Sequence, residues 1–166
     1  ADTNGPACVQ VFKTVVDNYV GKMCVFKVLS GKNKKDDTLF NANKGENEKI
    51  AKLYTLCGKK QVEVDSLCAG DIGATTKLAV TDTGDTLCTS KNVLKAEEIK
   101  FPKPVLSMAV LPKAKGDEEK ISAGLAKLME EDPTFKIFQN TETKQTVISG
   151  TGEQHIAVVT SKLASK

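Results

Sequence analysis

The chain has 166 residues, of which 40% are hydrophobic and 27% are charged, so it carries enough apolar material for one or two packed domains and lies outside the disordered class. Its formal net charge is +3 and all 24 basic residues are lysines, which excludes bidentate arginine contacts to phosphate or guanine, and an arginine finger acting in cis, from this segment. No apolar run approaches the roughly 20 residues that span a bilayer, and the N-terminal residues lack the features of a signal peptide; we therefore expect a soluble, cytoplasmic protein with no membrane partner.

The first part of the chain, residues 1–92, consists of short segments of alternating polarity separated by turn residues. The expected strands are Cys8–Lys13, Met23–Leu29, Thr38–Asn41, Glu48–Leu56, Val62–Val64, Asp71–Ala74 and Thr86–Cys88. Glycine, asparagine and aspartate cluster between them, which predicts turns at 32–37, 43–45, 58–60 and 82–85. Closing an antiparallel sheet into a small barrel removes its exposed edges. The sequence therefore predicts an all-β barrel over residues 1–92.

A charged stretch that ends in two prolines, residues 93–104, follows the predicted barrel. Pro102 and Pro104 favour an extended backbone and block a helix, as a semi-rigid linker requires. We therefore place a domain boundary in this linker.

The second part of the chain, residues 105–166, begins with an apolar strand at Val105–Leu111 and continues with a helix. Asp117 is expected to cap the start of this helix, and Asp132-Pro133 to end it. The apolar face of the helix is formed by residues that recur at helical spacing: Ile121, Leu125, Leu128 and Met129.

Two strands and a second helix complete the predicted second domain. The strands are Phe135–Phe138 and Thr146–Ser149, and the helix runs from about Glu153 to the chain end, with an apolar face formed by Ile156, Val159 and Leu163. The order β-α-β-β-α is that of an α+β ferredoxin-like split β-α-β domain lacking its last strand. We therefore expect Lys166 to be a cut in a longer chain.

The sequence contains no catalytic group that we would assign. A phosphate loop of the form G-x-x-x-x-G-K-[ST] is missing, so we expect neither GTP hydrolysis nor a bound cofactor in this segment. The five cysteines are odd in number, widely spaced and form no C-x-x-C pair, which favours buried free thiols. With a single histidine in the chain, we expect no metal site.

Two features allow both a structural and a functional interpretation. The most enzyme-like string is Gly150–His155, but two glycines at a strand-to-helix turn and Glu153 in the first helical turn favour a structural role. The lysines at 32–35, and Lys59 and Lys60, lie in predicted loops with acidic neighbours. A solvated loop and a contact to an RNA backbone both remain open for these lysines.

Ordered matches along nearly the whole chain resemble one protein family. In the first part they are Val11–Thr14, Ser30-Gly31, Asn43–Gly45, Gly58–Lys60, Val64-Asp65, Ala69–Ala74 and Thr83–Leu87. In the second part they are Pro102, Pro104, Asp117–Lys120, Glu131–Phe135, and Gly150 with Gly152, Glu153 and His155. The chain resembles the second and third domains of the elongation factor G family, and so many matches in order are more specific than any single motif.

The resemblance implies a ribosome-dependent translational GTPase that promotes translocation of transfer and messenger RNA. It implies a GTPase domain upstream, where GTP and Mg would bind, and further domains downstream. The implied partners are the RNA and proteins of the small ribosomal subunit and the chain's own missing domains. The candidate RNA contacts that the resemblance implies are Lys44, Lys49, Lys59 and Lys60. A strand-to-helix corner in the domain that couples nucleotide state to domain arrangement is marked by Gly150, Gly152, Glu153 and His155.

Other functions remain open at this point. One is a ribosome-protection factor that confers tetracycline resistance, another is a divergent paralogue, and a third is a stand-alone barrel module that binds RNA or protein. The chain also departs from the family pattern. Asn33 and Asp36 stand where the family usually has leucine and glycine, and Gln154 stands where a leucine usually precedes the histidine.

Overall fold

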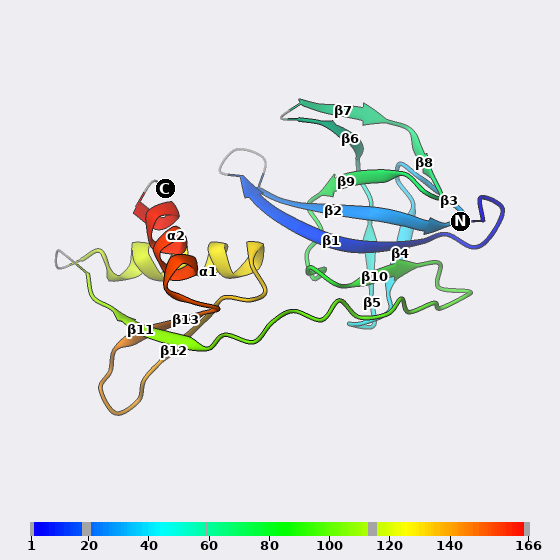
Figure 1. The fold of residues 1–166 in the computed structure, drawn as a ribbon. Coiled ribbons are helices and arrows are strands. Elements are labelled where there is room, and N and C mark those ends of the chain that lie inside the picture. Colours follow the sequence, from blue (N-terminus) through cyan, green and yellow to red (C-terminus); the bar gives the residue numbers. More distant parts are fainter. Residues whose placement is uncertain (1, 18–20, 59, 113–115, 165–166) are drawn as a thin grey trace. The chain divides into compact units, whose positions relative to one another are not determined.

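The computed structural model describes residues 2–17, 21–58, 60–112 and 116–164. It contains two compact units, Ala1–Ile99 and Lys100–Lys166, each with its own sheet (Figure 1). Each unit also has its own hydrophobic core.

The first unit is a β-barrel, and its main sheet has eight strands in the part of the chain that the structure describes. In spatial order they are β5 (Glu46–Lys49), β4 (Thr38–Asn41), β10 (Thr86–Cys88), β1 (Cys8–Asp17), β2 (Gly21–Ser30), β9 (Ile72–Thr76), β6 (Leu53–Cys57) and β7 (Lys60–Val64). A separate antiparallel ribbon joins β3 (Lys32–Lys34) to β8 (Ser66–Cys68). The all-β barrel predicted from the alternating pattern is confirmed.

One hydrophobic core fills the barrel. Val9 of β1, Phe26 of β2, Leu39 of β4 and Leu53 of β6 meet in this core, together with Leu67 of β8. Because β4 and β6 lie near opposite ends of the strand order, the sheet must curl for their side chains to share one cluster. The curl removes the apolar side chains of this cluster from water, which stabilises the barrel.

Two local predictions are wrong. Residues 32–37 are predicted as a turn, yet the first three form β3, because they pair with β8, far away in the sequence. The predicted strand Glu48–Leu56 is interrupted at residues 50–52, which separate β5 from β6. The Ile50 amide donates to the Asp37 carbonyl (2.9 Å), and the Ile50 carbonyl accepts from the Asp36 amide (2.8 Å). These bonds hold the chain where it passes from one end of the strand order to the other.

The second unit has the predicted α+β ferredoxin-like order. Its sheet runs β11 (Leu106–Val110), β13 (Thr146–Gly150), β12 (Lys136–Gln139). Helix α1 (Glu118–Glu131) connects β11 to β12, and α2 (Glu153–Ala164) follows β13. Both strand pairs are antiparallel, and the described residues show the order β-α-β-β-α.

Both helices pack on one face of this sheet. Ile148 of β13 contacts a cluster that includes Leu125 of α1 and Ile156 of α2. Asp117 occupies the predicted N-cap position of α1, although its side chain makes no capping hydrogen bond. Met129 is predicted on the packed face but is 42% exposed, because each helical residue advances about 100° around the axis and Leu128 occupies the buried stripe. Neither helix of the described chain is long and apolar enough to cross a membrane.

Candidate functional site

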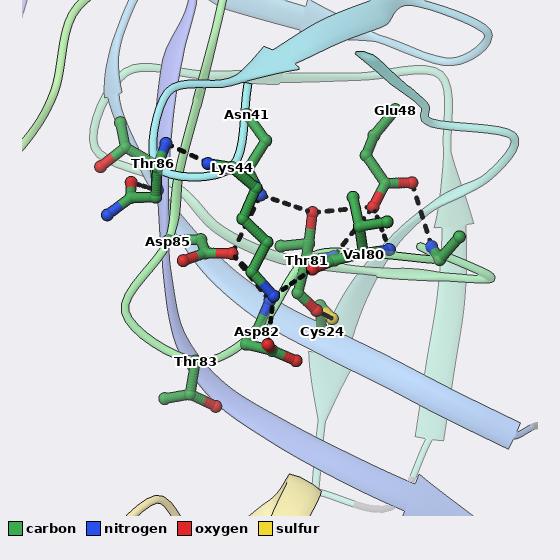
Figure 2. A network of polar contacts seen from close by, with 12 residues as sticks. Cys24, Asn41, Lys44, Glu48, Val80, Thr81, Asp82, Thr83, Asp85 and Thr86 are labelled. Carbon is green, nitrogen blue, oxygen red and sulfur yellow. Dashed lines mark hydrogen bonds and ion pairs between the residues drawn. The ribbon is translucent and has the colours of Figure 1, made fainter. Parts of the chain in front are cut away.

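A buried carboxylate anchors the 77–85 loop, which connects β9 to β10. Glu48 of β5 is 5% exposed and accepts hydrogen bonds from three consecutive amides, those of Ala79 (3.0 Å), Val80 (2.8 Å) and Thr81 (2.9 Å). The Thr81 hydroxyl donates a fourth bond at 3.0 Å (Figure 2). Burial acts to raise the pKa of Glu48, but these four bonds outweigh it and hold the pKa below its ordinary value. The loop is therefore fixed by an ionised side chain.

Asn41 at the end of β4 joins the β4–β5 turn to the same loop. Its Oδ1 accepts from the amides of Asn43 (2.9 Å) and Lys44 (3.1 Å), which closes the turn. Its Nδ2 donates to Thr81 Oγ1 (3.2 Å) and to Asp85 Oδ2 (2.9 Å). Asn41 is fully buried, and with these four bonds its amide is satisfied on both sides.

Lys44 is part of this network. Its Nζ forms an ion pair with Asp82 and lies 3.9 Å from Asp85 Oδ2, and it also donates to the Val80 carbonyl. Lys22 adds a second cation on Asp82, at 3.0 Å. Burial acts to raise the pKa of Asp82, but the hydrogen bonds from Lys44 and Lys22 outweigh it and lower the pKa. The charge of Lys44 is thus largely compensated within the barrel (Figure 2).

Two of the other predicted RNA-contact lysines, Lys49 and Lys60, lie elsewhere on the barrel. Lys49 at the end of β5 forms an ion pair with Asp36 at 3.1 Å, with side chains 63% and 61% exposed. Lys60 is exposed at the start of β7, at the opposite end of the strand order from β5. Lys59 lies outside the described residues. The structure therefore does not bring Lys44, Lys49 and Lys60 together into one cluster.

In the second unit, the residues at the end of α1 contact the residues at the start of α2. Asp132 Oδ1 accepts from the amide (2.9 Å) and the hydroxyl (2.5 Å) of Thr134, and its Oδ2 accepts from His155 Nε2 at 2.8 Å. The Thr151 amide donates to His155 Nδ1 at 3.0 Å, so Nδ1 is the acceptor and Nε2 carries the proton. Phe135 contacts the imidazole edge-on, with ring centroids 6.2 Å apart.

Burial acts to raise the pKa of Asp132, but the bonds from Thr134 and His155 outweigh it and lower the pKa below its ordinary value. Asp132 is also the C-cap of α1, since its amide donates to the Leu128 carbonyl at 3.0 Å. The backbone amide of Asp132 therefore caps α1, and its ionised carboxylate orders the turn that follows and orients His155 at the start of α2.

Gly150 is required by the close approach of His155 to the backbone. A Cβ on Gly150 would lie 2.9 Å from His155 Nδ1 and 3.2 Å from Ile156 Cγ1. Gly152 differs, because a Cβ there would meet nothing within 4 Å. Its carbonyl accepts from the Ile156 amide at 3.2 Å, and Glu153 follows as an exposed acidic residue in the first turn of α2, where the helix dipole favours negative charge.

The arrangement positions and orients segments of the chain, and its groups are mutually paired. In the part of the chain that the structure describes, no group of three or more His, Cys, Asp or Glu side chains is placed to hold a metal ion. The sequence alone identified Lys44 and His155 but not their partners Asp82 and Asp132. It also missed Glu48, the carboxylate that anchors the 77–85 loop. The turn composition of 82–85 and the string Glu131–Phe135 were the available signals; only the fold shows what these residues contact.

Two family models match the chain in sequence order. Residues 6–90 match the model described as "Elongation factor G domain 2", and residues 101–166 match "Elongation Factor G, domain III". The protein named Elongation factor G of Thermotoga maritima is 44% identical over 162 residues, which is 98% of this chain and 23% of that protein. Elongation factor G of Thermotoga petrophila is 43% identical over the same shares.

A solved structure has the same fold. The crystal structure of a Thermus thermophilus protein superimposes with a TM-score of 0.84 at 29% identity, covering 97% of this chain and 24% of that one. The chain thus spans about a quarter of the length of the relatives that it matches.

Proposed function

This chain belongs to the elongation factor G family, and on that premise we propose that it is the central segment of a ribosome-dependent translational GTPase that promotes translocation of transfer and messenger RNA. GTP and Mg would bind to a domain outside these residues. The barrel would contact the small ribosomal subunit, and the second unit would couple nucleotide state to domain arrangement. The observation that carries this proposal is the succession of two family domains over 98% of the chain at 44% identity.

The geometry separates the candidate RNA contacts into two groups. Lys49 and Lys60 are exposed, and an ion pair as exposed as Lys49–Asp36 contributes only about 0–1 kcal/mol, so a phosphate can replace Asp36. Lys44 is held by Asp82 and the Val80 carbonyl. Lys49 and Lys60 would therefore bind the RNA backbone, while Lys44 would hold the 77–85 loop in position.

The corner of the second unit supports a coupling role. His155, Gly150 and the carboxylate of Asp132 tie the end of α1 to the start of α2. An element that transmits an orientation between domains must resist bending, and a closed set of charged hydrogen bonds provides that stiffness. Gly152 and Glu153 would contribute by allowing and stabilising the sharp start of α2.

Binding to small ribosomal subunits tests the proposed contacts. The full-length factor would be co-sedimented with small subunits at increasing salt, as wild type and with Lys49→Ala or Lys60→Ala. Each lost phosphate contact is expected to reduce the slope of log affinity against log salt by about 0.7–0.9. Lys60→Arg, which keeps the charge, should retain the wild-type slope. Lys95→Ala is a matched control, because Lys95 is an exposed lysine of the same unit, paired with Glu98 at 2.7 Å.

The proposed activity has its own readout. Ribosomes are expected to stimulate GTP hydrolysis by the full-length factor, and messenger RNA is expected to move through the ribosome. Stimulated hydrolysis without movement of the messenger RNA would contradict translocation and favour a ribosome-protection factor. A factor that does not pellet with small subunits even at low salt would contradict the RNA contacts.

A further inference from the structure

Two thiols in the barrel are directly opposite each other on neighbouring strands. Cys8 of β1 and Cys88 of β10 are register partners in an antiparallel pair. The neighbouring pair in this register is Ala7 and Thr89, and it is hydrogen-bonded: the Thr89 amide donates to the Ala7 carbonyl at 3.1 Å. Because hydrogen-bonded and non-hydrogen-bonded pairs alternate along an antiparallel ladder, Cys8 and Cys88 form a non-hydrogen-bonded pair, whose Cα atoms approach to about 4.5 Å. That separation lies within the range of about 4.4–6.8 Å that a disulfide accepts.

Both thiols lie on the outward face of the barrel sheet and are nevertheless buried. Their neighbours Val9 and Leu87 belong to the barrel core, so the alternation of a strand turns Cys8 and Cys88 to the other face. Even so, Cys8 is 5% exposed and Cys88 is fully buried. Water and oxidants therefore reach this pair only when its cover moves.

The segment after β10 is attached beside the thiol pair. We call residues 89–99 the strap. The next outward pair along the same two strands is Gln10 and Thr86, and both hold the strap: Gln10 Nε2 donates to the Glu97 carbonyl (2.8 Å), and the Ala96 amide donates to Thr86 Oγ1 (3.2 Å). Beyond the Thr89 amide, which bonds to Ala7 where the strap leaves β10, these two hydrogen bonds are a weak attachment for a segment without regular structure, each contributing about 0.5–1.5 kcal/mol. Transient detachment of the strap is expected.

The other cysteines lack such a partner within the described residues. Cys57 is opposite Lys60, Cys68 is opposite Lys32, and Cys24 is opposite Thr14 and Thr75. The register thus makes Cys8–Cys88 the only directly opposed thiol pair among the described strands.

We propose that Cys8 and Cys88 form a redox-sensitive clamp: oxidation by a hydroperoxide converts the two thiols into a cross-strand disulfide that joins β1 to β10 at the start of the strap. One thiolate attacks the peroxide, which breaks the O–O bond and leaves a sulfenic acid and one water. The second thiol attacks the sulfenic sulfur, the S–S bond forms, and a second water leaves. Two thiols and one hydrogen peroxide thus give one disulfide and two waters.

Burial controls when the two thiols can be oxidised. Burial, and then the proximity of Cys88, raise the pKa of Cys8, so the Cys8 thiol stays protonated and unreactive in the closed barrel. Oxidation therefore depends on opening of the strap. The disulfide then closes a long loop of the chain, which restricts the unfolded state and stabilises the barrel.

The test is to oxidise the chain with hydrogen peroxide, alkylate the remaining thiols and map disulfide-linked peptides by mass spectrometry. The variants are Cys8→Ala, Cys88→Ala and the control Cys57→Ser/Cys68→Ser. We expect a Cys8–Cys88 linked peptide, with loss of two hydrogens, in wild type and in the control. The oxidised chain should unfold at a temperature higher by at least about 5 °C, and dithiothreitol should reverse the shift. Gln10→Ala, which releases the strap, should speed oxidation several-fold.

Several results would overturn the proposal. One is that Cys8 and Cys88 are still completely alkylated, and so still free thiols, after prolonged peroxide treatment of both wild type and Gln10→Ala. Full oxidation of Cys57 in the same samples would show that the treatment was sufficient. Another is linkage of either thiol mainly to Cys57 or Cys68. A Cys8–Cys88 disulfide that leaves the unfolding temperature unchanged or lowers it would overturn the clamp.

Discussion

Replacing Asn33 by leucine should stabilise the barrel. Asn33 of β3 is fully buried, and in the part of the chain that the structure describes its Oδ1 and Nδ2 have no hydrogen-bond partner. Its register partner is Leu67 of β8, which is 3% exposed and belongs to the barrel core. Asn33 therefore places an unsatisfied amide next to apolar side chains. Asn33→Leu removes both polar atoms and adds apolar contacts.

The size of the effect follows from two opposing contributions. A buried amide without hydrogen bonds costs about 1–3 kcal/mol, which leucine recovers together with additional apolar burial. Leucine is bulkier, and a tight fit would return part of this gain. The free energy of unfolding should therefore increase by about 1–2 kcal/mol. For a domain of this size that corresponds to a rise in melting temperature of about 4–16 °C.

Urea unfolding followed by far-UV circular dichroism measures the change, and hydrogen exchange of the β8 amides assigns it to the barrel. Asn33→Ala removes the amide without filling its space and should fall between wild type and Asn33→Leu. Asn47→Leu is the matched control, because Asn47 is an exposed asparagine on β5, and it should change stability by less than about 0.5 kcal/mol. If Asn33→Leu and Asn33→Ala both destabilise the barrel, the amide has a partner and the reasoning is refuted.

Two further predictions concern the anchors in each unit. In the wild type, Glu48 Oε2 accepts a hydrogen bond from the Ala79 amide. Glu48→Gln places an NH2 group there, so that two donors face each other. The free energy of unfolding, measured with urea at neutral pH, should fall by about 1–3 kcal/mol. Because the folded pKa of Glu48 is lowered, its stabilisation is present above the unfolded pKa and is lost as pH falls through the folded value, so wild type and Glu48→Gln should converge on acidification. Gly150→Ala should displace the His155 imidazole, since the new Cβ would lie 2.9 Å from Nδ1, and lower the free energy of unfolding by about 1–3 kcal/mol.

Each of these two variants has a control at a nearby position. Glu46→Gln alters an exposed glutamate of β5 and should leave the pH dependence unchanged. Gly152→Ala adds a Cβ that meets nothing within 4 Å and should cost less than Gly150→Ala when both are measured by urea unfolding. Equal costs for the two glycine variants would show that helix entry, and not the position of His155, explains the effect. A difference in the free energy of unfolding between wild type and Glu48→Gln that stays constant at all pH values would contradict the conclusion that Glu48 is ionised.

The departures from the family pattern show what local sequence can and cannot predict. Asn33 and Asp36 stand where the family usually has leucine and glycine, and the sequence alone left both in a polar turn. The structure places Asn33 in a buried strand and gives Asp36 a φ of 68°, a region that glycine adopts freely. Burial and backbone conformation at these positions explain the usual residues, and they depend on the pairing of β3 with β8.

In the candidate site, too, the sequence identified single residues, and only the fold shows which residues they contact. Sequence reasoning identified Lys44, but its partner Asp82 is 38 residues away, and nothing in the local pattern predicts their contact. His155 and Asp132 are separated by 23 residues and meet only because α1 and α2 pack on one sheet face. Lys49 and Lys60 remain predicted RNA contacts, since they are exposed.

The sequence by itself determined the barrel strands with clear alternation, the helices of the second unit and the order of both domains. These features depend on periodicity and turn chemistry within about ten residues, which a chain encodes locally. Tertiary structure alone decided the β3–β8 ribbon, the break at Ile50 and the amides that surround Glu48. The physical reason is that buried polar groups must find hydrogen-bond partners wherever the fold brings them, and those partners lie tens of residues away in the chain.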